Sequence, residues 1–196
     1  ALLACPDKQK LLRAKEAVLL DIEALPPILD PEESLRNEAT IWGTDNVQKR
    51  YLITKGAADT DDSVAGIDAA LAACEVRVTG RYSTHHQEQL YIEPQGVIAW
   101  WDESGVHATG SLQCPFYVHK AFLKVFNEDP GRIHITQAVT GGGFGGKEEY
   151  PSIIALHAAL LAKKSGRPVR MIYDRTEDIE ATTKRHPCHC EITTGF

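Results

Sequence analysis

The sequence predicts an α+β fold, in which paired strands and helices are mixed along the chain. Three observations predict it. Residues 96–111 are strand-like on both sides of a turn at Gly105, which is typical of a hairpin. Strand-like segments at 132–139 and 168–173 flank a long helical pattern over 148–165. Strand pairs that look antiparallel, mixed with helices in this order, indicate the α+β class.

The first 87 residues are predicted to contain two helices and two strands. A helix over residues 8–18 follows Pro6-Asp7, and VLLDIEAL (residues 18–25) has the composition of a strand that Pro26-Pro27 ends. A short Ala-rich helix is expected over 68–74, and a strand with alternating apolar residues over 75–87. The polar stretch between these pairs is typical of a connector.

The rest of the chain is predicted to be more regular. The hairpin strands are expected at 96–102 and 106–111, joined by Glu103-Ser104-Gly105. Apolar residues at helical spacing over 116–126 indicate a helix that Pro130-Gly131 ends. The long helix over 148–165 should stop at Gly166, directly after two lysines.

The composition excludes several function classes. Of 196 residues, 24% are charged and 43% hydrophobic, which argues against disorder. The formal net charge is −6, whereas nucleic-acid binding needs clustered basic charge, so we expect no nucleic-acid partner. No apolar run reaches the roughly 18 residues of a membrane span, so no membrane partner is expected. Five scattered cysteines are unlike a disulfide framework, which favours a cytoplasmic location.

The glycine run TGGGFGGKE, residues 140–148, has the clearest functional content. Five glycines between a strand and a helix let backbone N–H groups converge on a ligand. The helix that follows would add its free N–H groups and the positive end of its dipole. Such a junction suits an oxyanion, a phosphate or a metal-oxo group. In a purely structural alternative, the glycines only permit tight packing between helix and sheet.

Two known motifs share the spelling of this run. It matches the P-loop pattern G-x-x-x-x-G-K, but Glu148 stands where Ser or Thr is needed, and its carboxylate would repel phosphates. It also matches the dinucleotide pattern G-x-G-x-x-G from Gly141 to Gly146. A noncatalytic, Rossmann-like dinucleotide-binding module is therefore an alternative. Against it, the nearest suitable acid, Asp174, lies beyond the usual spacing of about 20 residues.

A compact cluster of histidines and cysteines at residues 186–190 invites a zinc interpretation. Its spacings are tighter than those of structural zinc sites. Alternate residues of a strand also point to opposite faces, so the cluster could not converge on one ion. We therefore expect no metal site here and predict that these are small core residues on a strand.

Further segments accompany the glycine run. RPVR at 167–170, DRTED at 174–178 and RHP at 185–187 lie downstream of it. Upstream, QEQLYIEP at 87–94 is similar to a Q-E-x-x-Y-x-E-P pattern, and Ser111-Leu112-Gln113 to an S-T-Q pattern, except at Leu112. With these segments, the chain resembles the molybdopterin-binding (large) subunit of the xanthine dehydrogenase/aldehyde oxidase family.

The resemblance implies a domain organisation. Residues 1–45 are expected to be the remnant of an α/β hammerhead domain, 46–74 a connector, and 75–196 the first part of a molybdopterin-binding domain with mixed sheet and helices. We therefore expect a fragment of a larger subunit.

The resemblance also implies an oxidoreductase that hydroxylates an N-heterocycle or an aldehyde at a molybdenum centre with oxo and sulfido ligands. Molybdopterin is the implied cofactor, with iron–sulfur clusters and FAD on other domains or subunits. Those parts, the remainder of the large subunit and a small-molecule substrate are the expected partners. The family's catalytic glutamate would lie beyond Phe196, so this chain is expected to form one wall of the site and to be inactive alone.

Site residues carried over from the family complete the prediction. The glycine turn would bind the cofactor through the backbone of Gly142, Gly143, Phe144 and Gly145. The N–H groups of Phe144 and Gly145 would point at an oxo ligand. Gln87 would place its amide beside the molybdenum, or else act as a strand residue bonded to backbone. Glu148 would orient the substrate, slightly favouring an N-heterocycle, or else offset a helix dipole.

Overall fold

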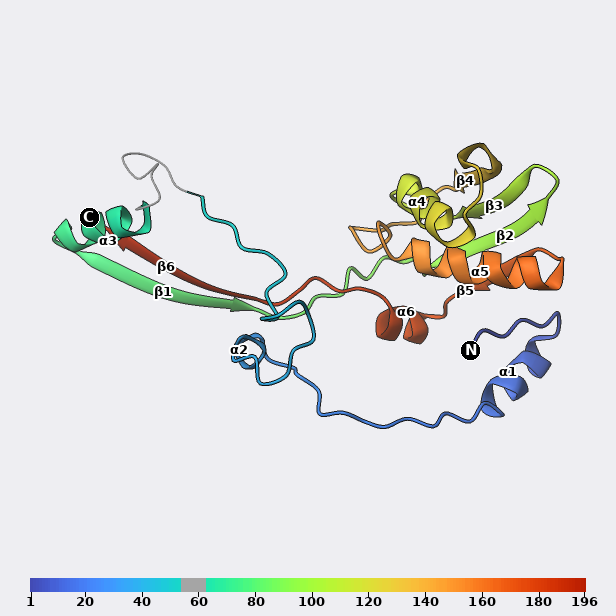
Figure 1. Ribbon diagram of the computed structural model, residues 1–196, viewed down its shortest axis with the longest axis horizontal. Coiled ribbons are helices and arrows are strands. Elements are labelled where there is room, and N and C mark those ends of the chain that lie inside the picture. Colours follow the sequence, from blue (N-terminus) through green and yellow to red (C-terminus); the bar gives the residue numbers. More distant parts are fainter. Residues whose placement is uncertain (54–62) are drawn as a thin grey trace. The chain divides into compact units, whose positions relative to one another are not determined.

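The computed structural model describes residues 1–53 and 63–196. They form two compact units, which are coloured along the chain in Figure 1. One unit comprises Ala1–Val18 and Ser83–His189, and the other comprises Leu19–Tyr82 and Cys190–Phe196. Residues 54–62 of the predicted connector lie outside the described residues.

A four-stranded sheet in the order β4-β3-β2-β5 organises the first unit. Its strands are β2 (Gly96–Asp102), β3 (Gly105–Gly110), β4 (Ile133–Gln137) and β5 (Val169–Ile172), which confirms the predicted hairpin and the two later strands. Strand β2 pairs antiparallel with both β3 and β5. Strand β4 pairs parallel with β3, so the expectation of antiparallel strands before the glycine run is wrong there. The helix between these two strands carries the chain back across the sheet, which makes them parallel.

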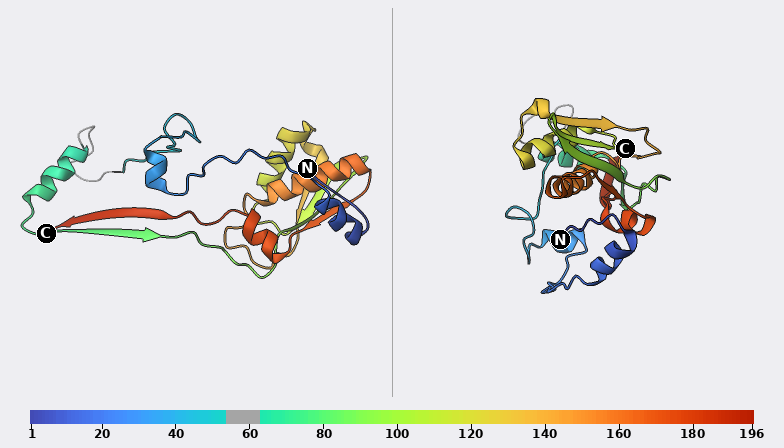
Figure 2. Two further views of the ribbon diagram at one scale, coloured as in Figure 1. Left: turned by 90° about the horizontal axis from the view of Figure 1, so that it is seen from below. Right: turned by 90° about the vertical axis from the view of Figure 1, so that its right-hand side faces the viewer.

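Two helices, α4 (Pro115–Phe126) and α5 (Pro151–Ser165), pack against each other and against the sheet (Figure 2). The core between them contains Val97, Ala99, Val106, Ala108, Val118, Phe122, Ile154, Ala155, Ala158 and Ala159. The alanines of α5 let its backbone approach the strands closely. The helix ends at Gly166 with φ +64°, as predicted.

Ring stacking covers part of the opposite face of the sheet. Trp100, His107 and His134 are cross-strand neighbours on β2, β3 and β4. The ring centroids of Trp100 and His107 are 4.8 Å apart, and those of the two histidines 4.5 Å. Three aromatic rings therefore tie the hairpin to the parallel strand.

The first unit contains three further helical segments. Helix α1 (Lys8–Glu16) confirms the predicted first helix, and the Asp7 carboxylate caps it by accepting from the N–H groups of Gln9 and Lys10 at 2.8 and 3.0 Å. A short 3-10 turn, η1 (Pro130–Arg132), precedes β4, and α6 (Arg175–Ala181) follows β5.

The second unit contains α2 (Pro31–Leu35), α3 (Ser63–Ala73) and a ribbon of β1 (Arg77–Thr84) and β6 (Cys188–Gly195), which run side by side in Figures 1 and 2. The predicted Ala-rich helix and the strand after it are thus confirmed. Val76 and Phe196 exchange both backbone hydrogen bonds at the end of the ribbon.

Two sequence expectations fail outside the main sheet. Residues 18–25 form no strand, and Leu19 is 93% exposed, because no neighbouring strand within the described ranges pairs with this segment. Cys188 and Cys190 do lie on a strand, but both are exposed rather than part of a core. Among residues 1–53 and 63–196, no cluster of His, Cys, Asp and Glu is arranged to hold a metal ion. None of the helices described is both long and apolar enough to cross a membrane.

Candidate functional site

The glycine turn, residues 141–149, connects β4 to α5 and is partly exposed. Its backbone takes positive φ at Gly142 (+97°), Phe144 (+49°) and Gly145 (+93°). Helix α5 begins at Pro151, so the expectation of a helix starting at about Glu148 is wrong by nearly a turn. Proline is favoured in the first helical turn, where its missing N–H costs nothing. The glycine turn is therefore a separate loop before the helix.

The glycines of this turn serve two different purposes. A Cβ atom on Gly141 would lie 2.7 Å from the Glu93 side chain, and one on Gly146 would lie 2.7 Å from the Tyr91 ring. A Cβ on Gly143 would overlap the Gln113 amide. These three positions need glycine for close packing, which supports the structural alternative for them. Gly145 is different, because a Cβ there would meet no atom within 4 Å.

Four of the nine N–H groups of the turn are hydrogen-bonded within the described residues, and the other five make no such bond. Gly141 donates to Glu93 Oε2 at 2.7 Å, and Gly146 donates to the Gly143 carbonyl at 2.7 Å. The N–H of Gly145 donates to Gln113 Oε1 at 3.1 Å. The Phe144 N–H makes no hydrogen bond within the described residues. Phe144 is 76% exposed as a residue and thus presents a free donor at the tip of the turn.

Gln113 is a site residue that the sequence prediction did not select. Its side-chain Oε1 accepts from the backbone N–H groups of both Gly145 and Lys147 at 3.1 Å. The backbone N–H of Gln113 donates to the Lys147 carbonyl at 2.7 Å. Two N–H donors identify the oxygen of the amide, so its Nε2 is the outward donor. That Nε2 makes no hydrogen bond in the part of the chain that the structure describes. The signal in the sequence was the Ser111-Leu112-Gln113 segment, whose role only the fold reveals.

A buried charge network lies beneath the turn. The Lys147 side chain is 0% exposed, and its Nζ lies 3.0 Å from Glu93 Oε2, 2.9 Å from Ser111 Oγ and 4.5 Å from the centroid of the Tyr91 ring. The Ser111 hydroxyl also donates to Glu93 Oε2 at 2.7 Å. This bond, together with Gly141 N–H and the lysine, holds the pKa of Glu93 below its usual value. Lys147 cannot reach a bound phosphate, which agrees with rejecting the P-loop interpretation.

A second row of bonds fixes the other end of the turn. Gln95 is buried, and its Nε2 donates to the Gly146 carbonyl and to the Tyr91 hydroxyl, each at 2.9 Å. The Tyr91 hydroxyl donates to Asp178 Oδ1 at 2.7 Å. Burial, followed by the bond to Asp178, raises the pKa of Tyr91. Tyr91, Glu93 and Gln95 come from one segment, so the chain before β2 supports the glycine turn from below.

The two predicted catalytic side chains have different surroundings. Glu148 is exposed on the turn itself, directly after Lys147. Gln87 is exposed and exchanges both backbone hydrogen bonds with Arg185, at 3.0 and 3.3 Å. Its side chain makes no hydrogen bond within residues 1–53 and 63–196. The structure thus connects Gln113, but not Gln87, to the glycine turn by hydrogen bonds.

The dinucleotide-binding alternative does not fit this geometry. The glycines at 141, 143 and 146, which would let a pyrophosphate approach, are packed against Glu93, Gln113 and Tyr91. The sheet is also mixed in direction, with β4 at one edge. A doubly wound parallel sheet would instead place the fingerprint at a central crossover.

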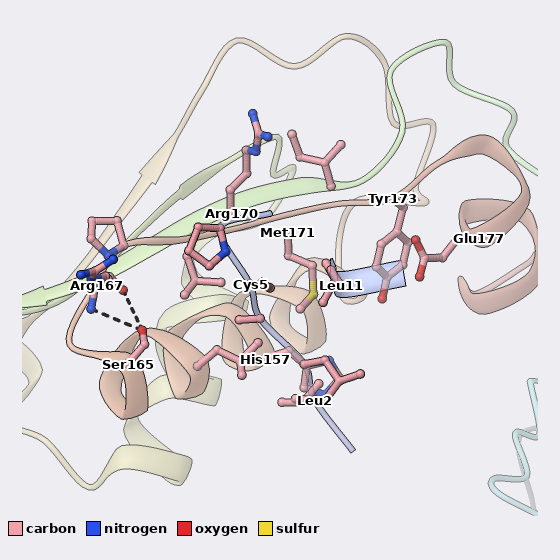
Figure 3. A pocket seen from close by; sticks show the side chains of 17 residues that line it. Leu2, Cys5, Leu11, His157, Ser165, Arg167, Arg170, Met171, Tyr173 and Glu177 are labelled. Atoms are coloured by element: carbon pink, nitrogen blue, oxygen red, sulfur yellow. Dashed lines mark hydrogen bonds between the residues drawn. The ribbon is translucent and has the colours of Figure 1, made fainter. Parts of the chain in front are cut away.

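A cavity of about 770 Å³ lies elsewhere in the same unit (Figure 3). It is lined by the segment before α1, by α5 and by β5, with Leu2, Cys5, His157, Arg170 and Met171 among its residues. None of the predicted site residues lines it. The cavity and the glycine turn are therefore separate features.

Comparisons with known proteins agree with the sequence resemblance. The family model for the molybdopterin cofactor-binding domain matches residues 46–196. The nicotinate dehydrogenase large molybdopterin subunit of Eubacterium barkeri is 29% identical over 197 residues, which cover 100% of this chain and 44% of that protein. Xanthine dehydrogenase/oxidase of Mus musculus is 31% identical over 186 residues, covering 94% of this chain and 13% of the relative.

A solved structure agrees at the level of the fold. The aldehyde oxidoreductase from Desulfovibrio gigas matches with a TM-score of 0.79 at 22% identity, covering 96% of this chain and 20% of that chain. This chain spans less than half the length of each of these three proteins.

Proposed function

Because this chain belongs to the molybdopterin cofactor-binding domain family, within the large subunits of the xanthine dehydrogenase/aldehyde oxidase type, we propose that it forms one wall of the molybdenum site of a larger hydroxylase. The observation that carries the proposal is the glycine turn. It combines a free N–H at Phe144, a free amide donor at Gln113, and a Gly145 with open space where a side chain would be. When bound, the molybdopterin cofactor supplies a redox centre with oxo groups, at which a substrate carbon is hydroxylated.

The residues of the turn would hold that cofactor with neutral dipoles. The Phe144 N–H and the Gln113 Nε2 would donate to anionic oxygen, and Gly142 and Gly143 would line the approach with backbone alone. Gly145 would contribute space, since its own N–H is bonded to Gln113. The charge of Lys147 is balanced by Glu93 beneath the turn, so it would support the turn rather than bind the cofactor.

Two glutamines could place an amide beside the metal: Gln87, which the sequence predicts, and Gln113, which the fold adds. Gln113 is favoured over Gln87 because its side chain is hydrogen-bonded to the turn. An amide can donate a hydrogen bond to an oxo group without changing charge, so it positions a group without acting as a base.

Glu148 would orient the substrate. Its exposed carboxylate lies on the turn, where it could accept a hydrogen bond from an N–H of a heterocycle. Nicotinate and xanthine, named for two relatives, are N-heterocycles. An N-heterocyclic substrate is therefore the first choice and an aldehyde the second.

The remaining parts of the proposal concern the whole protein. Residues 1–45 would be the end of an α/β hammerhead domain, 46–74 a connector and 75–196 the first part of the molybdopterin-binding domain. The rest of the large subunit would supply the catalytic glutamate, and iron–sulfur and FAD domains or subunits would accept the electrons. We propose a cytoplasmic location for this assembly.

The test is a metal and pterin analysis of the complete purified protein, with NADH titration as the control for the alternative. We expect stoichiometric molybdenum and pterin, hydroxylation of N-heterocycles, and no saturable NADH binding to this chain. Absence of molybdenum together with tight NADH binding at the glycine turn would overturn the proposal.

A further inference from the structure

We propose that Glu93 and Lys147 act as a pair of positioning residues, which set the direction of the Phe144 N–H and of the Gln113 amide at the proposed cofactor site. The pair lies under the glycine turn and does not face the ligand. The role therefore rests on the proposed function, but it makes a claim about this chain's own backbone that can be tested separately.

A single oxygen atom ties the two ends of the turn together. Glu93 Oε2 accepts from the N–H of Gly141 at 2.7 Å, where the turn begins. The same oxygen accepts from Nζ of Lys147, the residue that directly follows the last glycine of the turn, at 3.0 Å. The glycines between these residues have little intrinsic conformational preference. The conformation of the turn therefore depends on what holds its two ends.

The two partners are unequal in exposure. The Lys147 side chain is 0% exposed, whereas that of Glu93 is 44% exposed. The buried ammonium group of Lys147 contacts Glu93 Oε2, Ser111 Oγ and the face of the Tyr91 ring. A buried cation without its counter-charge is costly, because no water replaces the lost partner. Loss of the Glu93 charge should therefore displace Lys147, while loss of Lys147 leaves a carboxylate that water can still solvate.

Displacement of Lys147 would be passed directly to Gln113. The backbone N–H and carbonyl of Lys147 are bonded to the Gln113 side-chain oxygen and backbone N–H, at 3.1 and 2.7 Å. Ser111, two residues before Gln113, is hydrogen-bonded to both Glu93 and Lys147. The Gly145 N–H shares the same Gln113 oxygen. A shift at Lys147 thus changes the direction of the outward donors without any contact to the ligand.

The experiment compares Glu93→Gln, Lys147→Met and the double variant in the complete protein. Arg81→Gln is the matched control, because it breaks an exposed ion pair with Glu191 in the other unit. Hydrogen–deuterium exchange of a peptide covering residues 141–149 reports on the turn, and exchange of β2 reports on the core. The melting temperature measures global stability, and the electron paramagnetic resonance spectrum of the molybdenum centre reports on donors around the metal.

We expect Glu93→Gln to raise the exchange rate of the turn at least about tenfold, with β2 protected as in the wild type. The double variant should recover part of the protection, because it removes the unpaired cation and the glutamine oxygen can still accept from Gly141 and Ser111. The spectrum of the metal should change in Glu93→Gln and not in Arg81→Gln.

Wild-type exchange of the turn in Glu93→Gln would overturn the positioning role, as would an equal rise in β2, which indicates a merely structural effect. An unchanged metal spectrum with a mobile turn would also overturn it. Absence of molybdenum from the wild-type protein would refute the proposed function instead, and the exchange measurement would still decide whether the pair holds the turn.

Discussion

The side-chain oxygen of Gln113 lies 3.1 Å from the backbone nitrogen of Gly145, across 32 residues of sequence. This bond joins the loop before α4 to the glycine turn before α5. Because the oxygen is used for this bond, the amide nitrogen is left to face outward. Gln113 therefore both supports the turn and extends its row of donors.

The first prediction concerns which glutamine serves the site. Replacing Gln113 by Ala should lower kcat about 10²-fold, because it removes one donor and releases two N–H groups of the turn. Gln87→Ala is the matched control and should stay close to the wild type, since only its backbone is bonded. Turnover rates normalised to molybdenum content check this. A loss in Gln87→Ala without one in Gln113→Ala would favour the original sequence assignment.

The second prediction separates the two kinds of glycine. Gly145→Ala should cost roughly 1–2 kcal/mol of stability from its positive φ, and should abolish turnover by placing a methyl group in the open space. Gly141→Ala should lower the melting temperature further, because its methyl group would collide with Glu93. Thermal unfolding and turnover of both variants provide the measurement. Full activity in Gly145→Ala would contradict the role given to that open space.

The third prediction concerns substrate choice. Glu148→Val should lower the ratio of kcat/KM for N-heterocycles to that for aldehydes by about tenfold or more, because an apolar side chain cannot bond ring nitrogens. Glu149→Val is the control, since Glu149 is also exposed and immediately follows. Competition assays with paired substrates measure the ratio. An equal change in both variants would mean that Glu148 has no special part in substrate recognition.

The fourth prediction concerns acid stability. The bonds from Ser111 and Gly141 and the ion pair with Lys147 lower the pKa of Glu93 from its usual 4.5. A carboxyl group whose pKa is lowered by folding stabilises the protein above its unfolded pKa, and this stabilisation is lost as the pH falls through the folded value. The wild type should therefore melt higher than Glu93→Gln by a constant margin above about pH 5, and the margin should shrink in more acidic buffer. A margin that grows on acidification would show the opposite linkage.

Local signals predicted most of the secondary structure. The hairpin could be predicted because a glycine stands between two strand-like runs, and Gly105 indeed adopts φ +132°. The end of α5 could be predicted because a glycine follows the helical pattern, and Gly166 is left-handed there. The direction of β4 could not be predicted, because it depends on the path of α4 across the sheet. The strand predicted at 18–25 did not form, because a strand-like composition leads to a strand only where a partner strand is available.

The candidate site was predicted in part. The glycine turn stood out by composition, and its position between a strand and a helix is confirmed. The side chains that pack against three of its glycines could not be predicted from sequence spacing. Tyr91, Glu93 and Gln113 approach these glycines only in the folded chain. The resemblance directed attention to Gln87 because the QEQLYIEP pattern is long, whereas the shorter segment at Gln113 carried the contact.

The packing of Gly141, Gly143 and Gly146 against Glu93, Gln113 and Tyr91 has a consequence for anyone who would transplant this loop. An octapeptide GGGFGGKE inserted between a strand and a helix of an unrelated scaffold would bring its glycines but not the side chains that shape them, and its lysine would arrive without a counter-charge. A working graft would also have to include two distant stretches of polypeptide, residues 91–95 and 111–113, so the loop functions only as part of a patch of tertiary structure.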